Sequence, residues 1–296
     1  MSATATYDLH LHTYWSHDAS VAPEDHLTRA SQLGVRCIAI TEHDNQDSLD
    51  ELLQAAVRYP EVRVIPSAEL TVSTSIGDID LLCYGFPLAG QPQLQALMQM
   101  YAQLRLDTAR ALVRGLIELG CDFDDELLDE LAKSYRPANI VARQGLTQIH
   151  GEVLRIHLLK TGDITHEDEF GEFRARAKRI AGAPAYPAID HVVPVAQRLG
   201  AVVSMAHPTL YLDEFDVQRL DALREEIGFD GIECAHPAIP QALTPQYRAY
   251  CVERGLVSTA GSDSHTAAQI EAGFATHGGP EEWMEELSER LADDSA

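Results

Sequence analysis

Short apolar runs alternate with helix-like segments along much of the chain. Seven of these runs are rich in β-branched or aliphatic residues and are bounded by glycine, proline or polar residues, a pattern typical of strands. They cover residues 6–11, 35–40, 62–65, 79–84, 201–205, 231–234 and 256–259. Helical patterns lie between several of them, and Pro23 and Gly34 stand where one such helix would begin and end. This alternation predicts a parallel α/β architecture.

The middle of the chain shows a different pattern. Apolar residues recur at helix spacing from Leu94 to Tyr101 and again from Leu112 to Ile117, and Gly120 would end the helix. The following stretch, 124–183, is charged and contains no convincing strand. We therefore predict a mostly helical insertion at about 91–185, whose methionine and tyrosine side chains serve core packing.

Residues capable of metal or acid–base chemistry follow the predicted strands. In parallel α/β folds the loops at the carboxyl ends of the strands converge on one face, so residues distant in sequence meet there. The residues at these positions are His10, His12, His43, Glu69, His207, Asp263 and His265.

His10 and His12 are the most informative pair, because residues i and i+2 of a strand point to the same side. The two imidazoles should therefore project together towards the interior of a barrel. With carboxylates arriving from other strands, they would form a divalent metal site, and this mixture of ligands suits Zn, Mn or Fe(II) better than Ca or Mg.

Composition narrows the class of protein. The chain has 296 residues and a net charge of −24, which argues against a broad surface for long duplex nucleic acid but permits a small anionic substrate held by metal ions. Five dispersed cysteines indicate reduced thiols. We find neither an apolar run long enough to span a membrane nor a signal peptide, so we expect a cytoplasmic protein with no membrane partner.

These residues resemble, as a set, the motifs of the PHP (polymerase and histidinol phosphatase) family. The matching stretches are DLHLHT at 8–13, Ser16-x-Asp18, TEHD at 41–44, Glu69, AHP at 206–208 and GSDSH at 261–265. Arg155-Ile-His157 is similar to the Arg-x-His element of the stand-alone metal-dependent phosphoesterases of this family. The motifs span nearly the whole chain in the family's order.

The resemblance implies a distorted (β/α)7 barrel of PHP type with a mostly helical insertion. The barrel would comprise 1–90 and 186–296, and the insertion would comprise 91–185, with His157 returning to the metal site. It also implies two to three divalent ions, Mn, Zn or Fe. The first would be held by His10, His12, Glu69 and Asp263, the second by Glu69, His157 and His207, and the third by Asp18, His43 and His265.

Some of these assignments have competitors. His17 is an alternative to Asp18, but the spacing to Pro23 favours Asp18. Asp80 stands where the family usually has histidine, and it either orients a neighbouring imidazole or is a plain strand-edge carboxylate.

The other histidines are mostly interpreted as bystanders. His150 and His166 compete with His157, but only His157 has an arginine two residues before it. We expect surface positions for His26, His191 and His277, while His236 would either line the pocket or belong to a plain turn.

The function that the resemblance implies is a metal-dependent phosphoesterase. A hydroxide bridging two metals would attack phosphorus, so no side-chain nucleophile is needed, and Asp263 and His265 are the nearest candidates to this hydroxide. Arg155 is the candidate for binding the substrate phosphate. Expected substrates are small phosphomonoesters or nucleotides, such as nucleoside 3′,5′-bisphosphates. Alternatives are 5′-3′ exoribonuclease activity on short RNA, hydrolysis of a non-phosphate bond such as an amide, and a non-catalytic metal-stabilised module.

Overall fold

The computed structural model describes residues 5–88, 90–212 and 214–293. The chain divides into two compact units. The first, here called the barrel unit, comprises Met1–Thr13, Val21–Met98 and Tyr186–Ala296. The second, the helical unit, comprises Tyr14–Ser20 and Gln99–Ala185.

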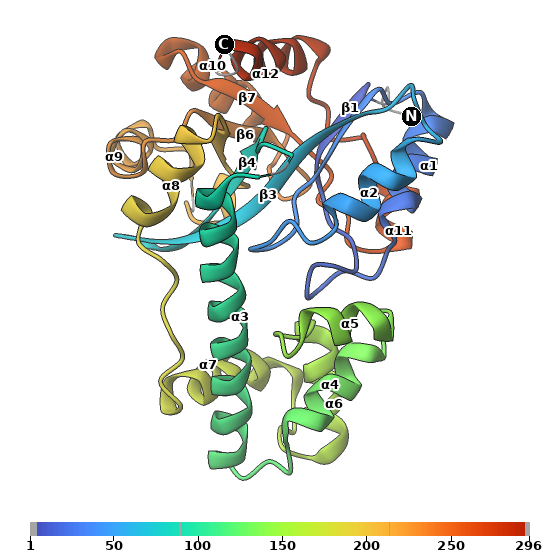
Figure 1. The fold of residues 1–296 in the computed structure, drawn as a ribbon. Coiled ribbons are helices and arrows are strands. Elements are labelled where there is room, and N and C mark those ends of the chain that lie inside the picture. The colour runs from blue at the N-terminus through green and yellow to red at the C-terminus, as the bar shows by residue number, and fades with distance from the viewer. Residues whose placement is uncertain (1–4, 89, 213, 294–296) are drawn as a thin grey trace. The chain divides into compact units, whose positions relative to one another are not determined.

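The barrel unit is built on one seven-stranded sheet in which the strands follow each other in chain order (Figure 1). All seven strands expected from the apolar runs are present. They are β1 (Tyr7–Leu11), β2 (Cys37–Ile40), β3 (Arg63–Thr74), β4 (Gly77–Tyr84), β5 (Val202–Met205), β6 (Gly231–Ala235) and β7 (Val257–Ala260).

The sheet is parallel as expected, except at β4. This strand runs antiparallel to both of its neighbours, β3 and β5, while the other neighbouring pairs are parallel. Only Ser75 and Ile76 separate β3 from β4, and such a short connection can join only antiparallel strands. Gly77, with a φ of 117°, adopts the left-handed backbone region directly after this turn.

The two ends of the sheet meet, so that it nearly closes into a barrel. Leu11 forms a parallel bridge with Ser264, and the backbone N–H of Asp263 donates to the carbonyl of His10 at 2.8 Å. Glycine is required beside this seam, because a Cβ on Gly261 would lie 2.2 Å from the Cβ of His10. The expected barrel is therefore confirmed.

Among the described residues, five α-helices of the barrel unit lie between strands and two more follow β7. Their apolar faces pack on the sheet, as Leu27 and Ala30 of the first do near Ile38 of β2. This helix begins at Pro23, and its N-terminus is stabilised by Asp25, whose carboxylate accepts the backbone N–H of Ala22 at 2.9 Å. The helices are α1 (Pro23–Leu33), α2 (Leu49–Ala56), α8 (Ile189–Arg198), α9 (Val217–Ile227), α10 (Thr244–Arg254), α11 (Ala267–Gly273) and α12 (Glu281–Asp293), and a short 3-10 helix, η2 (Pro208–Leu210), follows β5.

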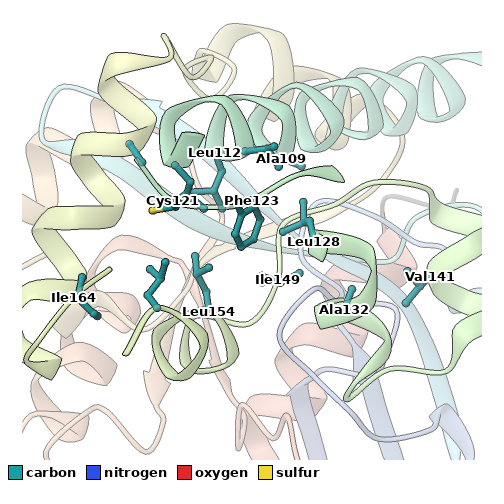
Figure 2. Packing of buried hydrophobic residues seen from close by; sticks show 14 residues of the cluster. Ala109, Leu112, Cys121, Phe123, Leu128, Ala132, Val141, Ile149, Leu154 and Ile164 are labelled. Atoms are coloured by element: carbon teal, nitrogen blue, oxygen red, sulfur yellow. The ribbon is translucent and has the colours of Figure 1, made fainter. Parts of the chain in front are cut away.

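The helical unit has a hydrophobic core of its own (Figure 2). Phe123 and Leu128 lie in this core together with Leu112 and Leu154, which come from two other helices. The mostly helical character of the insertion is thus confirmed. Its elements are the second part of α3 (Pro92–Glu118), then α4 (Asp125–Lys133), α5 (Ala138–Gln144), α6 (Gly151–Thr161), the 3-10 helix η1 (Glu167–Glu169) and α7 (Phe170–Ile180).

The loop 14–20, which directly follows His12, is held by the helical unit. Arg136 donates from Nε to the carbonyl of Tyr14 at 2.7 Å, and Gln144 donates to the carbonyl of Trp15 at 2.9 Å. The loop therefore packs as part of this unit, although it lies far from 99–185 in the sequence. None of the helices in the described ranges is both long and apolar enough to cross a membrane.

Candidate metal centre

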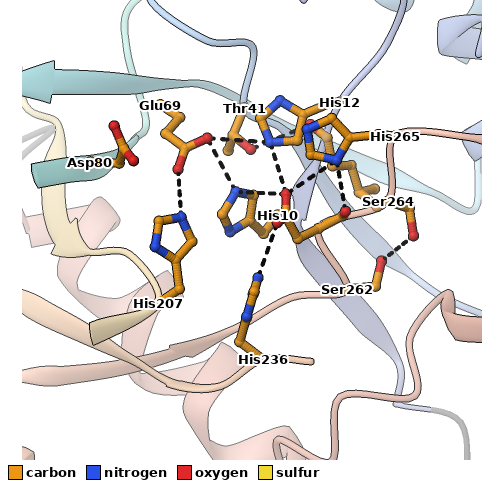
Figure 3. A network of polar contacts seen from close by, with 12 residues as sticks. His10, His12, Thr41, Glu69, Asp80, His207, His236, Ser262, Ser264 and His265 are labelled. Carbon is orange, nitrogen blue, oxygen red and sulfur yellow. Dashed lines mark hydrogen bonds and ion pairs between the residues drawn. The ribbon is translucent and has the colours of Figure 1, made fainter. Parts of the chain in front are cut away.

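Seven of the nine predicted ligands belong to the barrel unit and form one cluster that includes Glu69. Five of the seven are labelled in Figure 3. His10 lies in β1, His12 follows it, and both are fully buried. Glu69, also fully buried, lies in the middle of β3 and not after a strand as expected, because β3 continues to Thr74. The remaining four follow β2, β5 and β7; they are His43, His207, Asp263 and His265.

Four ligand-type atoms of this cluster lie at nitrogen–oxygen distances that suit the ligands of a single metal ion. Nε2 of His10 lies 3.3 Å from both Oε2 of Glu69 and Oδ1 of Asp263. Nε2 of His12 lies 3.3 Å and 3.2 Å from the same two oxygens. Ligands held about 2.1 Å from an ion at tetrahedral angles are about 3.4 Å apart. The residues present therefore fit a divalent cation.

Glu69 also connects this group to two further sets of ligands. Its second oxygen, Oε1, lies 3.1 Å from Nε2 of His207, while Oε2 lies 3.1 Å from Nδ1 of His43. A carboxylate with imidazoles against both oxygens is suited to bridging two ions. His43 in turn groups with His12 and His265, whose ligand atoms all lie within 4.8 Å of one another. The family resemblance implied His12 as a ligand of the first ion only.

The electrostatics of the cluster favour a bound cation. Burial raises the pKa of Glu69, but His10 and His43 outweigh burial and hold this pKa well below its usual range. The pKa of Asp263 is likewise held well below its usual range, because His10 outweighs burial. Burial lowers the pKa of His10, yet Glu69 and Asp263 raise it well above normal. The carboxylates thus stay ionised and keep His10 protonated. The positive charge of that proton lies where a bound metal cation would supply positive charge instead.

The backbone at the site is strained. Only four non-glycine residues in the described ranges have positive φ, namely Asp44 (55°), His207 (26°), Asp263 (51°) and Ala275 (55°). Two of the four, His207 and Asp263, are predicted ligands, and Asp44 follows a third. Such residues cost about 1–3 kcal/mol each and persist where the surroundings hold them. The N–H of Asp44, for example, donates to the carbonyl of Glu69 at 2.7 Å.

The other two predicted ligands belong to the helical unit. His157 lies on α6, and its buried Nε2 has no hydrogen-bond partner among the described residues. Asp18 lies in the loop 14–20, where its charge adds to burial in raising the pKa of Tyr135 to about 12. An unsatisfied buried imidazole nitrogen is what a ligand leaves when its ion is absent, and the roles of both residues stay predictions.

Arg155, the predicted phosphate-binding residue, also lies on α6. Its guanidinium donates to the carboxylate of Glu152 from Nε at 2.8 Å and forms an ion pair with Glu167 at 2.6 Å. Both pairs would compete with a substrate phosphate, and its role in binding stays a prediction.

Two further residues at the end of β6 belong to the site: Glu233, which was not predicted, and His236, for which the sequence left a pocket position and a plain turn open. Glu233 is fully buried, with Oε1 3.0 Å from Nδ1 of His10. His236 is buried, with Nε2 3.2 Å from Oδ2 of Asp263. The signal for Glu233 was available as a lone acid inside an apolar strand, GIECA, and His236 follows its strand as the predicted ligands follow theirs.

Asp80, on β4, is held by hydroxyl groups. Thr71 donates to Oδ1 at 2.6 Å, and Tyr211 donates to Oδ2 at 2.7 Å. Each carboxylate oxygen of Asp80 therefore accepts a hydrogen bond from a hydroxyl group. These two bonds explain why an acid can be held at this position without binding a metal ion. Figure 3 shows it beside Glu69, outside the network of dashed contacts.

Comparison with known proteins agrees with the geometry. The chain is 24% identical over 268 residues to a 5′-3′ exoribonuclease of Haemophilus influenzae, with 88% of this chain and 90% of the relative covered. It is 24% identical over 274 residues to a 3′,5′-nucleoside bisphosphate phosphatase of Chromobacterium violaceum, with 90% and 89% covered. A Bifidobacterium adolescentis protein, described provisionally as a metal-dependent phosphoesterase, has the same fold, with a TM-score of 0.74, 21% identity and 98% of both chains covered.

The family model that matches the chain is the PHP domain. It covers residues 8–183, which is more than half of the 296 residues. The matched region begins at the DLHLHT motif and includes His10, His12, His43 and Glu69. This chain therefore belongs to the PHP domain family.

Proposed function

We propose that the chain is a metal-dependent phosphoesterase that hydrolyses small phosphomonoesters or nucleotides. The observation that carries this proposal is the set of four atoms from His10, His12, Glu69 and Asp263, in which each imidazole nitrogen lies 3.2–3.3 Å from both carboxylate oxygens. Together with the matches to a phosphatase and an exoribonuclease, this spacing favours phosphate ester hydrolysis over a binding role.

The cofactors in this proposal are two or three divalent ions, with Mn, Zn and Fe favoured by the mixture of imidazole and carboxylate ligands. When bound, such ions activate water for attack on phosphorus and neutralise the phosphate oxygens. The protein's own contribution is positional. Glu69 holds one oxygen towards His207 and the other towards His10 and His12, so that two groups of ligands share one carboxylate.

The side from which a substrate would arrive follows from burial. The side chains of His10, His12 and Glu69 are 0% exposed. Those of His43, His265 and Asp263 are 20%, 16% and 26% exposed. A phosphate group would therefore reach the ligands past these three residues.

The substrate class rests on the relatives and on charge. The Chromobacterium violaceum relative is a 3′,5′-nucleoside bisphosphate phosphatase, which makes a nucleoside 3′,5′-bisphosphate the first compound to try. The Haemophilus influenzae relative supports a second candidate, 5′-3′ trimming of short RNA. The net charge of −24 favours small substrates over long polyanions in either case.

The test is phosphate release by Mn-loaded protein from three compounds: a nucleoside 3′,5′-bisphosphate, a simple phosphomonoester and a 5′-phosphorylated RNA oligomer. The compound preferred by kcat/KM separates phosphatase from exonuclease. Asp263→Ala should abolish release, because Oδ1 of Asp263 faces both His10 and His12. His191→Ala is the matched control, since His191 is an exposed histidine on α8, and it should retain full activity.

Two outcomes would contradict the proposal. Full activity of Asp263→Ala would show that the reaction takes place elsewhere. No release from any of the three compounds, with metals shown to be bound, would point to another hydrolysable bond, and an amide substrate would be the next to try.

A further inference from the structure

Strand β6 supplies no predicted ligand, yet its end places two buried side chains against three of them. One of the two, His236, is labelled in Figure 3. We propose that Glu233 and His236 are positioning residues of the metal centre. Glu233 orients His10 and His207, and His236 orients Asp263. This inference rests on the proposed function in taking those three residues as ligands.

Glu233 sets the orientation of the His10 ring. Its Oε1 lies 3.0 Å from Nδ1 of His10, while Nε2 of the same ring faces Glu69 and Asp263. A carboxylate can only accept, so Nδ1 carries the proton and donates it to Glu233. The lone pair of the neutral ring is then on Nε2 and points to the place of the ion, and the carboxylate raises the basicity of that nitrogen.

The second oxygen of Glu233 holds His207. Oε2 accepts the backbone N–H of His207 at 2.8 Å. His207 has φ of 26° and ψ of 61°, a strained conformation for a residue with a side chain. This bond helps to fix the peptide from which the imidazole reaches Oε1 of Glu69, 3.1 Å from Nε2. One buried carboxylate thus connects ligands on both sides of Glu69.

His236 acts on Asp263 through a defined tautomer. The backbone N–H of Ala238 donates to Nδ1 of His236 at 3.0 Å, so Nδ1 is the acceptor and Nε2 carries the proton. Nε2 lies 3.2 Å from Oδ2 of Asp263. The other oxygen, Oδ1, faces His10 and His12. His236 therefore occupies Oδ2 and leaves Oδ1 as the oxygen directed at an ion.

His10, Glu233 and His236 could also be taken as the ligands of a separate ion, since their ligand atoms lie within 4.8 Å of one another. That reading would require both nitrogens of His10 to bind metals at once. It would also remove the proton that joins Nδ1 to Glu233. The positioning role requires neither, and the number of ions bound distinguishes the two.

The experiment measures metal affinity independently of activity. Metal-free wild type, Glu233→Gln, His236→Leu and His236→Gln would be titrated with Zn in competition with a chromophoric chelator, and bound ions would be counted by elemental analysis. Loss of a side chain that holds a ligand in this way should weaken metal binding about 10- to 100-fold without changing the number of ions at saturation. His236→Gln should recover part of the affinity lost in His236→Leu, because its amide can still donate to Asp263.

Ser204→Ala is the matched control. Ser204 is buried in the same barrel and its hydroxyl pairs with that of Thr259 at 2.9 Å, and neither is a predicted ligand. The Zn affinity of Ser204→Ala should equal that of wild type. Zn affinities of the Glu233 and His236 variants within about threefold of wild type would overturn the positioning role. One bound ion fewer in Glu233→Gln or His236→Leu would show that the substituted residue is itself a ligand. Wild type that binds Zn tightly but releases no phosphate would contradict the proposed function alone.

A second measurement does not depend on the variants folding. In the Zn-loaded wild type, 15N shifts of the imidazoles should show protonated Nδ1 for His10 and protonated Nε2 for His236. The opposite tautomer at either ring would overturn the role of its partner.

Discussion

His26 is a buried base at the back of the metal centre. It lies on α1, is fully buried, and its Nε2 donates to the carbonyl of His12 at 2.8 Å. Burial lowers the pKa of His26 to about 4, from 6.5 for an exposed histidine. The sequence suggested a surface position, because a single polar residue on a helix usually faces water.

This burial predicts an acid-sensitive fold. The folded state keeps His26 neutral, so its contribution to stability is complete above pH 6.5 and declines as pH falls towards about 4, because the unfolded chain binds the proton first. A pKa lowered from 6.5 to about 4 corresponds to a loss of about 3 kcal/mol in the free energy of unfolding. Urea unfolding of the metal-free protein across this range measures it. His26→Gln, whose amide can still donate to the carbonyl of His12, should lose less unfolding free energy than wild type over this pH range. An equal pH dependence of the unfolding free energy in the two proteins would show that His26 is not the responsible group.

Residues of the site differ in how visible they are in the sequence. Histidines and acids that follow strands, such as His43 and Asp263, stand out against an apolar background, and their position at one end of a barrel follows from topology. Glu233 and His26 were missed, and His236 was left between two alternatives, because their roles depend on which neighbours bury them. A single sequence shows that a residue is polar, but it does not show what the residue faces.

At the scale of elements, the helical unit depends on one close approach between helices. A Cβ on Gly115 of α3 would lie 1.9 Å from the carbonyl oxygen of Ala177 on α7. The neighbouring atom is backbone and cannot rotate away. Glycine at this position therefore allows the two helices to touch.

Gly115→Ala should destabilise the helical unit by about 1–3 kcal/mol or more, because it overpacks a helix crossing. Gly171→Ala is the matched control, since Gly171 lies on α7 with nothing within 4 Å of the added Cβ, and alanine there should stabilise by about 0.5–1 kcal/mol. Denaturant unfolding followed by circular dichroism measures both. Equal effects of the two substitutions would show that the approach at Gly115 is not tight.

The strands show both the strength and the limit of periodicity. Apolar runs located all seven strands, since buried β-strands in such a fold are nearly continuous in Val, Ile and Leu. The run 62–65 was too short, however, because Pro66 and Ser67 interrupt it and β3 continues to Thr74. Because β3 extends to Thr74, Glu69 lies inside a strand. This extension is the part of β3 that pairs antiparallel with β4, and the apolar run alone does not reveal that pairing.

At the scale of the whole molecule, the net charge of −24 opposes compaction. The metal-free protein should gain stability with salt, because the Debye length falls from about 10 Å at 0.1 M to about 3 Å at 1 M. We expect the Tm to rise by several degrees in NaCl over this range. Thermal unfolding measures the shift, and an equal osmolarity of a neutral solute is the control. A Tm that stays constant or falls in NaCl would show that self-repulsion is negligible.

The seam between β1 and β7 has a consequence for the order of events at the ribosome. His10 and Asp263, which share this seam, are separated by about 250 residues. At about 5–20 residues per second, His10 and His12 leave the ribosome roughly 10 to 50 s before Asp263 exists. During that time the growing chain displays a pair of imidazoles without the carboxylate that completes their group. If the proposed ligands hold metal, we expect the group of His10, His12 and Asp263 to be loaded late in biogenesis, in competition with any ion that the unfinished chain meets first.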